Sequence, residues 1–81
     1  MEIQQLENII VTHIQQGNGF TKEMRTILLD YKNTGGTQDK VVALLNKLKT
    51  ENPDNQIIQD GADDILDIAT GYCGPSMRVW E

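Results

Sequence analysis

The stretch that decides the fold is TQDKVVALLNKLKTENPDNQIIQDGADDILDIATG, residues 37–71. It opens with Thr37, a residue type that commonly caps a helix, and continues with the strongest apolar face of the chain. That face consists of Val41, Val42, Leu44, Leu45 and Leu48. Residues 52–55, Asn-Pro-Asp-Asn, predict a turn, because proline cannot continue a helix and Asn and Asp side chains bond to nearby backbone. The stretch therefore predicts two helices joined by a short turn.

The second of these helices has apolar residues on one side and aspartates on the other. At 100° per residue, an arc of about 80° contains Ile57, Gly61, Ile65, Ile68 and Tyr72, with Ile58 and Ala69 just beyond it. Gly61 lies inside this arc, where the missing side chain permits close helix packing. About 100° on the opposite side is occupied by Asp60, Asp63, Asp64 and Asp67. We call these four aspartates the acidic face.

The N-terminal half predicts two more helices. The first runs from Ile3 to Gln16 and ends at the glycines of residues 17–19. Its inward positions are Ile3, Leu6, Ile10, His13 and Ile14, widened by Ile9 and Val11. The second follows Thr21 as N-cap and ends near Asn33, before the Gly35-Gly36 break. Its inward positions are Met24, Ile27, Leu28 and Tyr31.

The remaining residues, 73–81, have no helical period, and Pro75 prevents a helix there, so this tail is expected to be a loop or a short extended segment. A length of 81 residues supports a single modest core. We therefore expect an all-α fold: one helical domain over residues 1–81, built as a small bundle of about four short helices with an irregular C-terminal tail.

Charge is distributed unevenly along the chain. The net charge is −5, and residues 51–81 carry seven acidic residues against Arg78 alone. Such a field repels phosphate and anionic lipid and attracts basic protein surfaces. We therefore expect a protein partner rather than nucleic acid or membrane. A single cysteine cannot form an internal disulfide, and no stretch is apolar for long enough to span a bilayer, which together indicate a cytoplasmic protein.

Candidates for chemistry are few. His13 lies on an apolar stripe, where a packed, hydrogen-bonded histidine is expected rather than a general base. Cys73 is expected to be a structural thiol rather than a nucleophile. One histidine and one cysteine are too few for a zinc site, and Gly61 falls too early for a calcium-binding loop. We expect no enzyme activity, no cofactor and no metal.

Two surface features remain, each with two interpretations. The acidic face is either an ordinary solvated surface or the docking site for a cationic partner; like charges at this spacing disfavour the helix, so local stability does not explain them. The tail is either a lid packed over the bundle or a segment that leaves Trp80 partly exposed, as an interface anchor.

The segment from Asp64 to Trp80, DILDIATGYCGPSMRVW, resembles the C-terminus of small bacterial proteins that are grouped with toxin immunity proteins. The shared pattern is glycine, aromatic, cysteine, small, proline, then methionine or leucine, arginine, aliphatic and tryptophan. The turn at residues 35–37 before a leucine-rich helix is similar too. This resemblance implies an immunity protein of a contact-dependent growth inhibition or related polymorphic toxin system, which blocks a toxin domain inside the cell.

The expected function is therefore stoichiometric inhibition of a partner protein, most concretely a basic toxin domain of the nuclease type. The expected contact residues are Asp60, Asp63, Asp64, Asp67 and Trp80. The alternative is a small adaptor or regulatory subunit that binds another protein through its apolar C-terminal tail. The sequence leaves the oligomeric state open.

Overall fold

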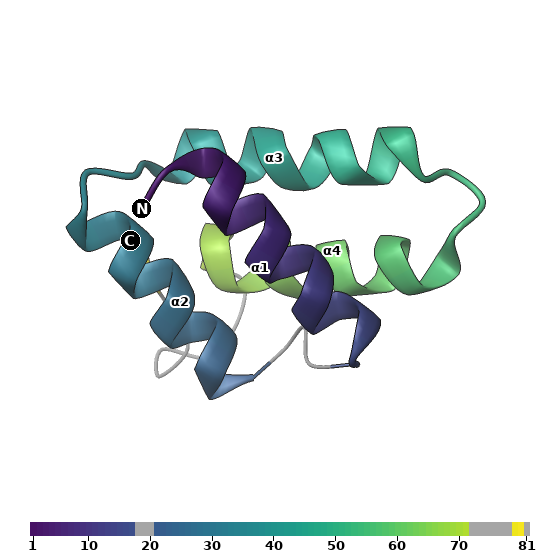
Figure 1. Ribbon diagram of the computed structural model, residues 1–81, viewed down its shortest axis with the longest axis horizontal. Coiled ribbons are helices and arrows are strands. Elements are labelled where there is room, and N and C mark those ends of the chain that lie inside the picture. The colour runs from purple at the N-terminus through teal and green to yellow at the C-terminus, as the bar shows by residue number, and fades with distance from the viewer. Residues whose placement is uncertain (18–20, 72–78, 81) are drawn as a thin grey trace.

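The computed structural model describes residues 1–17, 21–71 and 79–80, and these residues form four helices (Figure 1). The helices are α1 (Ile3–Gln15), α2 (Lys22–Asn33), α3 (Gln38–Glu51) and α4 (Gln56–Thr70). The predicted all-α class and small helical bundle are confirmed, since no strand occurs in the described parts of the chain. None of these helices is long and apolar enough to cross a membrane.

Three of the helices begin at a side chain that caps them. The hydroxyl oxygens of Thr21 and Thr37, the two predicted N-caps, accept hydrogen bonds from the backbone N–H groups of Met24 and Lys40, at 3.1 and 3.4 Å. Asn55 does the same for α4 through Oδ1, which accepts from the N–H of Ile58 at 3.2 Å. Each cap satisfies a backbone donor that has no partner inside its helix. The turn chemistry therefore fixes where each helix starts.

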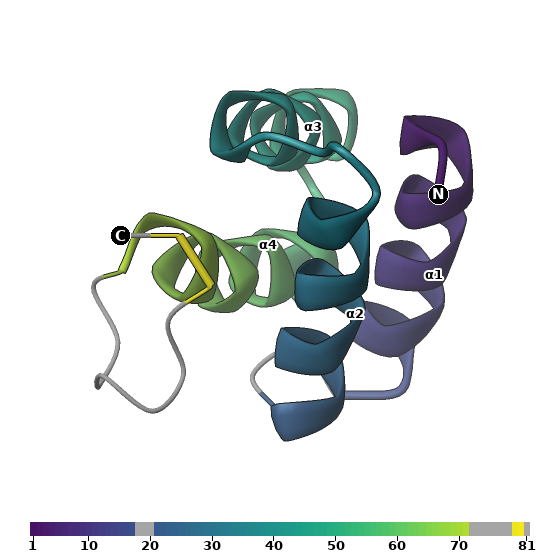
Figure 2. The same cartoon turned by 90° about the vertical axis from the view of Figure 1, so that its left-hand side faces the viewer.

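The four helices pack as two antiparallel pairs that cross one another. Figure 1 shows α3 and α4 side by side along the long axis, with α1 running steeply across α4. Turned by 90°, Figure 2 shows α1 and α2 as the second pair, beside the α3–α4 pair. The crossing of α1 over α4 is close because Gly61 has no side chain: a Cβ placed there would lie 2.5 Å from Ile14 Cγ2. The predicted role of Gly61 in close packing is confirmed.

All four helices contribute to one hydrophobic core. Leu6 and Ile10 of α1, Met24 and Leu28 of α2, Val41 and Leu45 of α3, and Ile65 and Ile68 of α4 are fully buried. Burial of this apolar area is the main source of stability for a domain of this size.

Two predicted core positions are wrong. Ile3 is 40% exposed and Ile57 is 62% exposed. Each occupies the first turn of its helix. Ile3 faces α3 across an open groove, and Ile57 lies next to the α3–α4 turn, which Figure 1 shows at the end of the pair, beyond α1 and α2. Ala62, which the prediction omitted, is fully buried instead. The buried side of α4 is thus rotated by about 40° from the predicted arc, at 100° per residue.

The C-terminal tail was predicted to be irregular. Cys73 and most of this tail, together with Tyr72, lie outside the described residues. Val79 and Trp80 are described: Val79 is 4% exposed within the core, and Trp80 is partly buried against it. The carbonyl oxygen of Val79 accepts a hydrogen bond from Lys32 Nζ at 2.9 Å, which joins this end of the chain to α2.

Candidate functional site

The rotation of α4, which decides the residues that it presents to solvent, is set by its attachment to α3. Near the start of α4, Gln59 Nε2 donates to the carbonyl oxygens of Lys49 and Asn52, at 2.7 and 2.9 Å. Near its end, Gln38 Nε2 donates to the carbonyl oxygen of Ala69 at 2.8 Å. These amide groups also satisfy carbonyl groups at the ends of both helices. With both ends fixed, α4 buries its apolar side and turns its aspartates outward.

The acidic face lies on the outer side of α4, and all four of its aspartates are exposed. Two of them have partners within the protein. Asp63 forms an ion pair with Lys49 of α3, with 2.5 Å between Nζ and Oδ1, and Asp60 accepts a hydrogen bond from Gln56 at 2.7 Å. Asp64 and Asp67 have no hydrogen-bond or ion-pair partner among the residues that the structure describes. These two carboxylates are therefore the ones most available to an external cation.

No lysine or arginine lies among the four aspartates in the sequence of α4, but Lys49 of the neighbouring helix neutralises Asp63. An exposed pair of this kind contributes little to stability, since water screens the attraction. It nevertheless removes Asp63 from the set of unpaired charges. Only the folded structure could show this, because Lys49 and Asp63 belong to different helices.

Asp64 lies in the most unfavourable electrostatic environment of the four. Partial desolvation raises the pKa of its carboxyl, and the charges of Asp67, Asp60 and Asp63 raise it further. On the helix wheel Asp64 is the member nearest the buried side of α4, which accounts for the desolvation. Asp67 and Asp60 lie three and four residues away, at helical spacing, and Asp63 is the preceding residue. The acidic face therefore keeps a charged group at a position that disfavours charge.

Replacing Asp64 with asparagine is expected to stabilise the protein slightly near neutral pH. Because the folded-state pKa is raised, the charged form costs stability once the pH exceeds that pKa, and asparagine removes this cost. Screening at this exposed site limits the gain to a few tenths of a kcal/mol. Urea unfolding at about pH 7 and about pH 3 measures it. The gain should vanish at the lower pH, where Asp64 is protonated in both states; an equal gain at both would contradict the charge explanation. Asp30→Asn, at an exposed site on α2, is the control.

His13 was predicted to be a packed, hydrogen-bonded core histidine, and the hydrogen bond is wrong. Its side chain is 19% exposed and lies at the edge of the core. Its Nδ1 atom has no hydrogen-bond partner and lies 3.8 Å from Glu23 Oε2, a distance that permits an ion pair only when the imidazole is protonated. Among the described residues, no carboxylate or nucleophilic side chain is hydrogen-bonded to this ring.

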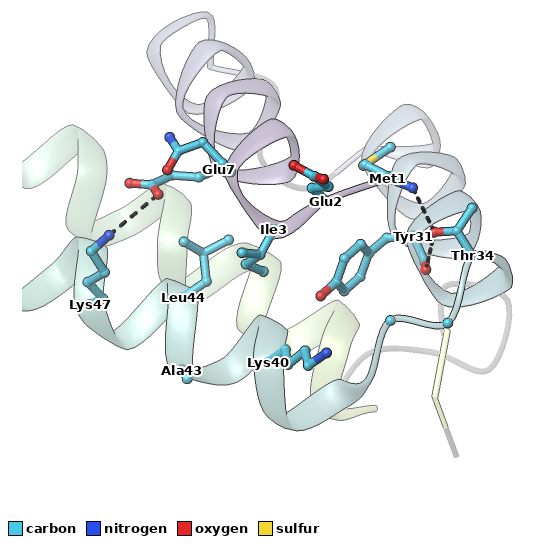
Figure 3. Close-up of a pocket in the computed structure, with 13 residues that line it drawn as sticks. Met1, Glu2, Ile3, Glu7, Tyr31, Thr34, Lys40, Ala43, Leu44 and Lys47 are labelled. Carbon is cyan, nitrogen blue, oxygen red and sulfur yellow. Dashed lines mark hydrogen bonds and ion pairs between the residues drawn. The ribbon is translucent and has the colours of Figure 1, made fainter.

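The structure shows a second feature that the sequence did not predict. An open groove of about 630 Å³ lies between the start of α1, the end of α2 and the first half of α3 (Figure 3). Its lining includes Ile3, Tyr31, Lys40, Ala43, Leu44 and Lys47. The only sequence signal was the spacing of the four α3 residues, which places them on one face of that helix. Which helix lies opposite is set by tertiary packing alone.

Comparison with known proteins found no matching family model, no matching curated protein and no matching solved structure. Among the described residues, no group of three or more His, Cys, Asp or Glu side chains is arranged to hold a metal ion. Functional proposals therefore rest on the geometry of the acidic face and of the groove.

Proposed function

We propose that this protein is a stoichiometric inhibitor of another protein, and most concretely the immunity partner of a basic, nuclease-type toxin domain. The observation that carries the proposal is the exposed acidic face, in which Asp64 and Asp67 have no partner among the described residues. Desolvation raises the pKa of the Asp64 carboxyl and the neighbouring aspartates raise it further, and like charges at this spacing also cost helix stability. A cationic partner would offset that cost upon binding.

The proposed mechanism is occlusion rather than chemistry. Nuclease grooves are basic because they bind a phosphate backbone, so an acidic helix can occupy the same track. The net charge of −5, concentrated in residues 51–81, would also steer the two proteins together and raise the association rate. Trp80, partly buried beside the core, would contribute an apolar contact at the edge of the interface.

The test begins with a pull-down from the native host, followed by identification of the bound protein and measurement of its association rate. Neutralising the two unpartnered charges together, Asp64→Asn with Asp67→Asn, is expected to slow association about tenfold at low salt and to flatten its salt dependence. The matched control is Asp30→Asn with Glu51→Gln, which removes two exposed negative charges from α2 and α3. Equal rates for the two double variants, or association that salt does not affect, would contradict docking through the acidic face.

The alternative is an adaptor that binds its partner through the apolar tail. Deleting residues 76–81 cannot test it, because the deletion also removes Val79 from the protein's own core. Trp80→Ala is the sharper variant, since this side chain is only partly buried. Loss of partner binding in Trp80→Ala, with normal binding by the Asp64 and Asp67 variants, would favour the adaptor.

A further inference from the structure

The groove contains two polar groups that the fold leaves without partners. Tyr31 is 3% exposed, yet its hydroxyl has no hydrogen-bond partner among the described residues. Figure 3 shows this hydroxyl pointing into the groove, between Ile3 and Lys40. The ammonium group of Lys40, on the α3 wall, likewise has no partner in the described parts of the chain. Two donors, one of them on a buried side chain, therefore face the same space.

The other charges of the groove are two positive and two negative groups. Lys47 Nζ lies 3.5 Å from Glu7 Oε2, and this ion pair joins α3 to α1 across one end of the groove (Figure 3). The two remaining charges of the lining, the Glu2 carboxylate and the N-terminal ammonium of Met1, have opposite signs, and the ammonium donates to Thr34 Oγ1 at 3.0 Å. Lys40 is therefore the one lysine of the lining without a counter-charge among the described residues. Charge complementarity calls for a ligand with a single negative charge.

The remaining lining is apolar. Ile3 is 40% exposed, one of the two large apolar side chains with substantial exposure in the described chain. Ala43 and Leu44 face it from α3 (Figure 3). Lys40 and Lys47 mark the two ends of this wall, about 10 Å apart at 1.5 Å per residue. The backbone of α3 is bonded within its own helix here, so the wall presents no partners for the amide groups of a peptide.

We propose that this groove binds a small apolar monocarboxylate. The carboxylate accepts hydrogen bonds from the Tyr31 hydroxyl and the Lys40 ammonium, and the hydrocarbon body lies against Ile3, Ala43 and Leu44. A free acyl carboxylate fits better than a peptide segment, because its body needs no hydrogen bonds and its length is limited by the Glu7–Lys47 pair. This site is separate from the acidic face and does not depend on the immunity function.

The test is a titration of the full-length ¹⁵N-labelled protein with sodium octanoate, followed through the amide signals of Gly36, Ala43 and Leu44. Saturable one-to-one binding is expected, with a Kd on the order of 1 mM for a ligand of this size. Octan-1-ol, which keeps the chain and lacks the charge, should bind about fivefold more weakly. Equal binding of the two, or signal changes that do not saturate, would overturn the carboxylate site.

Three variants locate the contact. Lys40→Gln should weaken octanoate binding about fivefold and Tyr31→Phe about threefold, while octan-1-ol binding stays the same in both. Lys22→Gln, an exposed lysine at the start of α2, is the matched control and should bind octanoate normally. Urea unfolding of each variant confirms an intact fold. Unchanged octanoate binding in Lys40→Gln would overturn the proposal. A peptide that contains leucine and aspartate and binds this groove more tightly than octanoate would also overturn it.

Discussion

Replacing Gly61 with alanine is expected to destabilise the protein by about 2 kcal/mol, although alanine is the better helix former. The added Cβ would lie 2.5 and 2.7 Å from the two Cγ atoms of Ile14 and 3.0 Å from its Cβ. Ile14 is β-branched and 2% exposed, so it has little freedom to move away. To relieve the clash, α1 would have to move away from α4, and this movement would open the core.

The measurement is urea unfolding of the two single variants, Gly61→Ala and Ile14→Ala, and of the double variant. Truncating Ile14 removes the two closest atoms, so the cost of Gly61→Ala should be smaller in that background, and the coupling between the positions should be favourable by at least about 1 kcal/mol. If Gly61→Ala stabilises the protein by the helix-propensity difference alone, the close crossing of α1 and α4 is wrong.

The sequence could predict Gly61 as a packing position because apolar periodicity shows which side of a helix is buried. The same argument identified the four helices and the outward placement of the acidic face, whereas residue type identified Thr21 and Thr37 as N-caps. It failed at Ile3 and Ile57 because periodicity assumes that a helix is covered along its whole length. The first turn of α1 borders an open groove and the first turn of α4 lies beyond α1 and α2, and both arrangements depend on how the pairs cross.

For the same reason, the sequence could not predict which residues pair with one another at the candidate sites. The Lys49–Asp63 pair and the Glu7–Lys47 pair each join residues of different helices, and no spacing rule relates them. Gly36 was interpreted as part of a turn, but it also leaves room for a ring: a Cβ there would lie 2.3 Å from two ring atoms of Tyr31. This contact holds the ring at the groove. The prediction of a turn therefore missed the role of Gly36 in tertiary packing.

The described end of the tail bears on both functional proposals, because it shows which apolar residues remain free for a partner. Val79 is buried among core side chains and Lys32 holds its carbonyl oxygen, so this part of the tail belongs to the fold. Trp80 retains partial exposure. The acidic face, by contrast, has little role in the core. A partner could bind the acidic face without displacing any buried residue, whereas binding through Val79 would require part of the core to open.

Truncation of residues 79–81 is therefore expected to destabilise the protein by about 3 kcal/mol. Burial of a valine side chain contributes about 2 kcal/mol, and the lost contact of Trp80 and the lost hydrogen bond from Lys32 account for the remainder. Urea unfolding followed by far-UV circular dichroism measures the change, since the truncated chain has no tryptophan. Removal of Glu81 alone is the matched control and should leave the midpoint close to that of the full chain.

Val79→Thr tests the burial of the Val79 side chain while residues 79–81 are retained. Threonine has nearly the shape of valine but places a hydroxyl in an apolar site, so a cost of about 1–2 kcal/mol is expected with Trp80 retained. Trp80 is the single tryptophan, and its fluorescence then reports directly on the docked tail. A tail that detaches before the helices unfold would give a fluorescence transition at lower urea than the circular dichroism transition. Coincident transitions would instead show that the tail end and the bundle unfold together, and stability equal to the native chain in both variants would contradict docking of Val79 in the core.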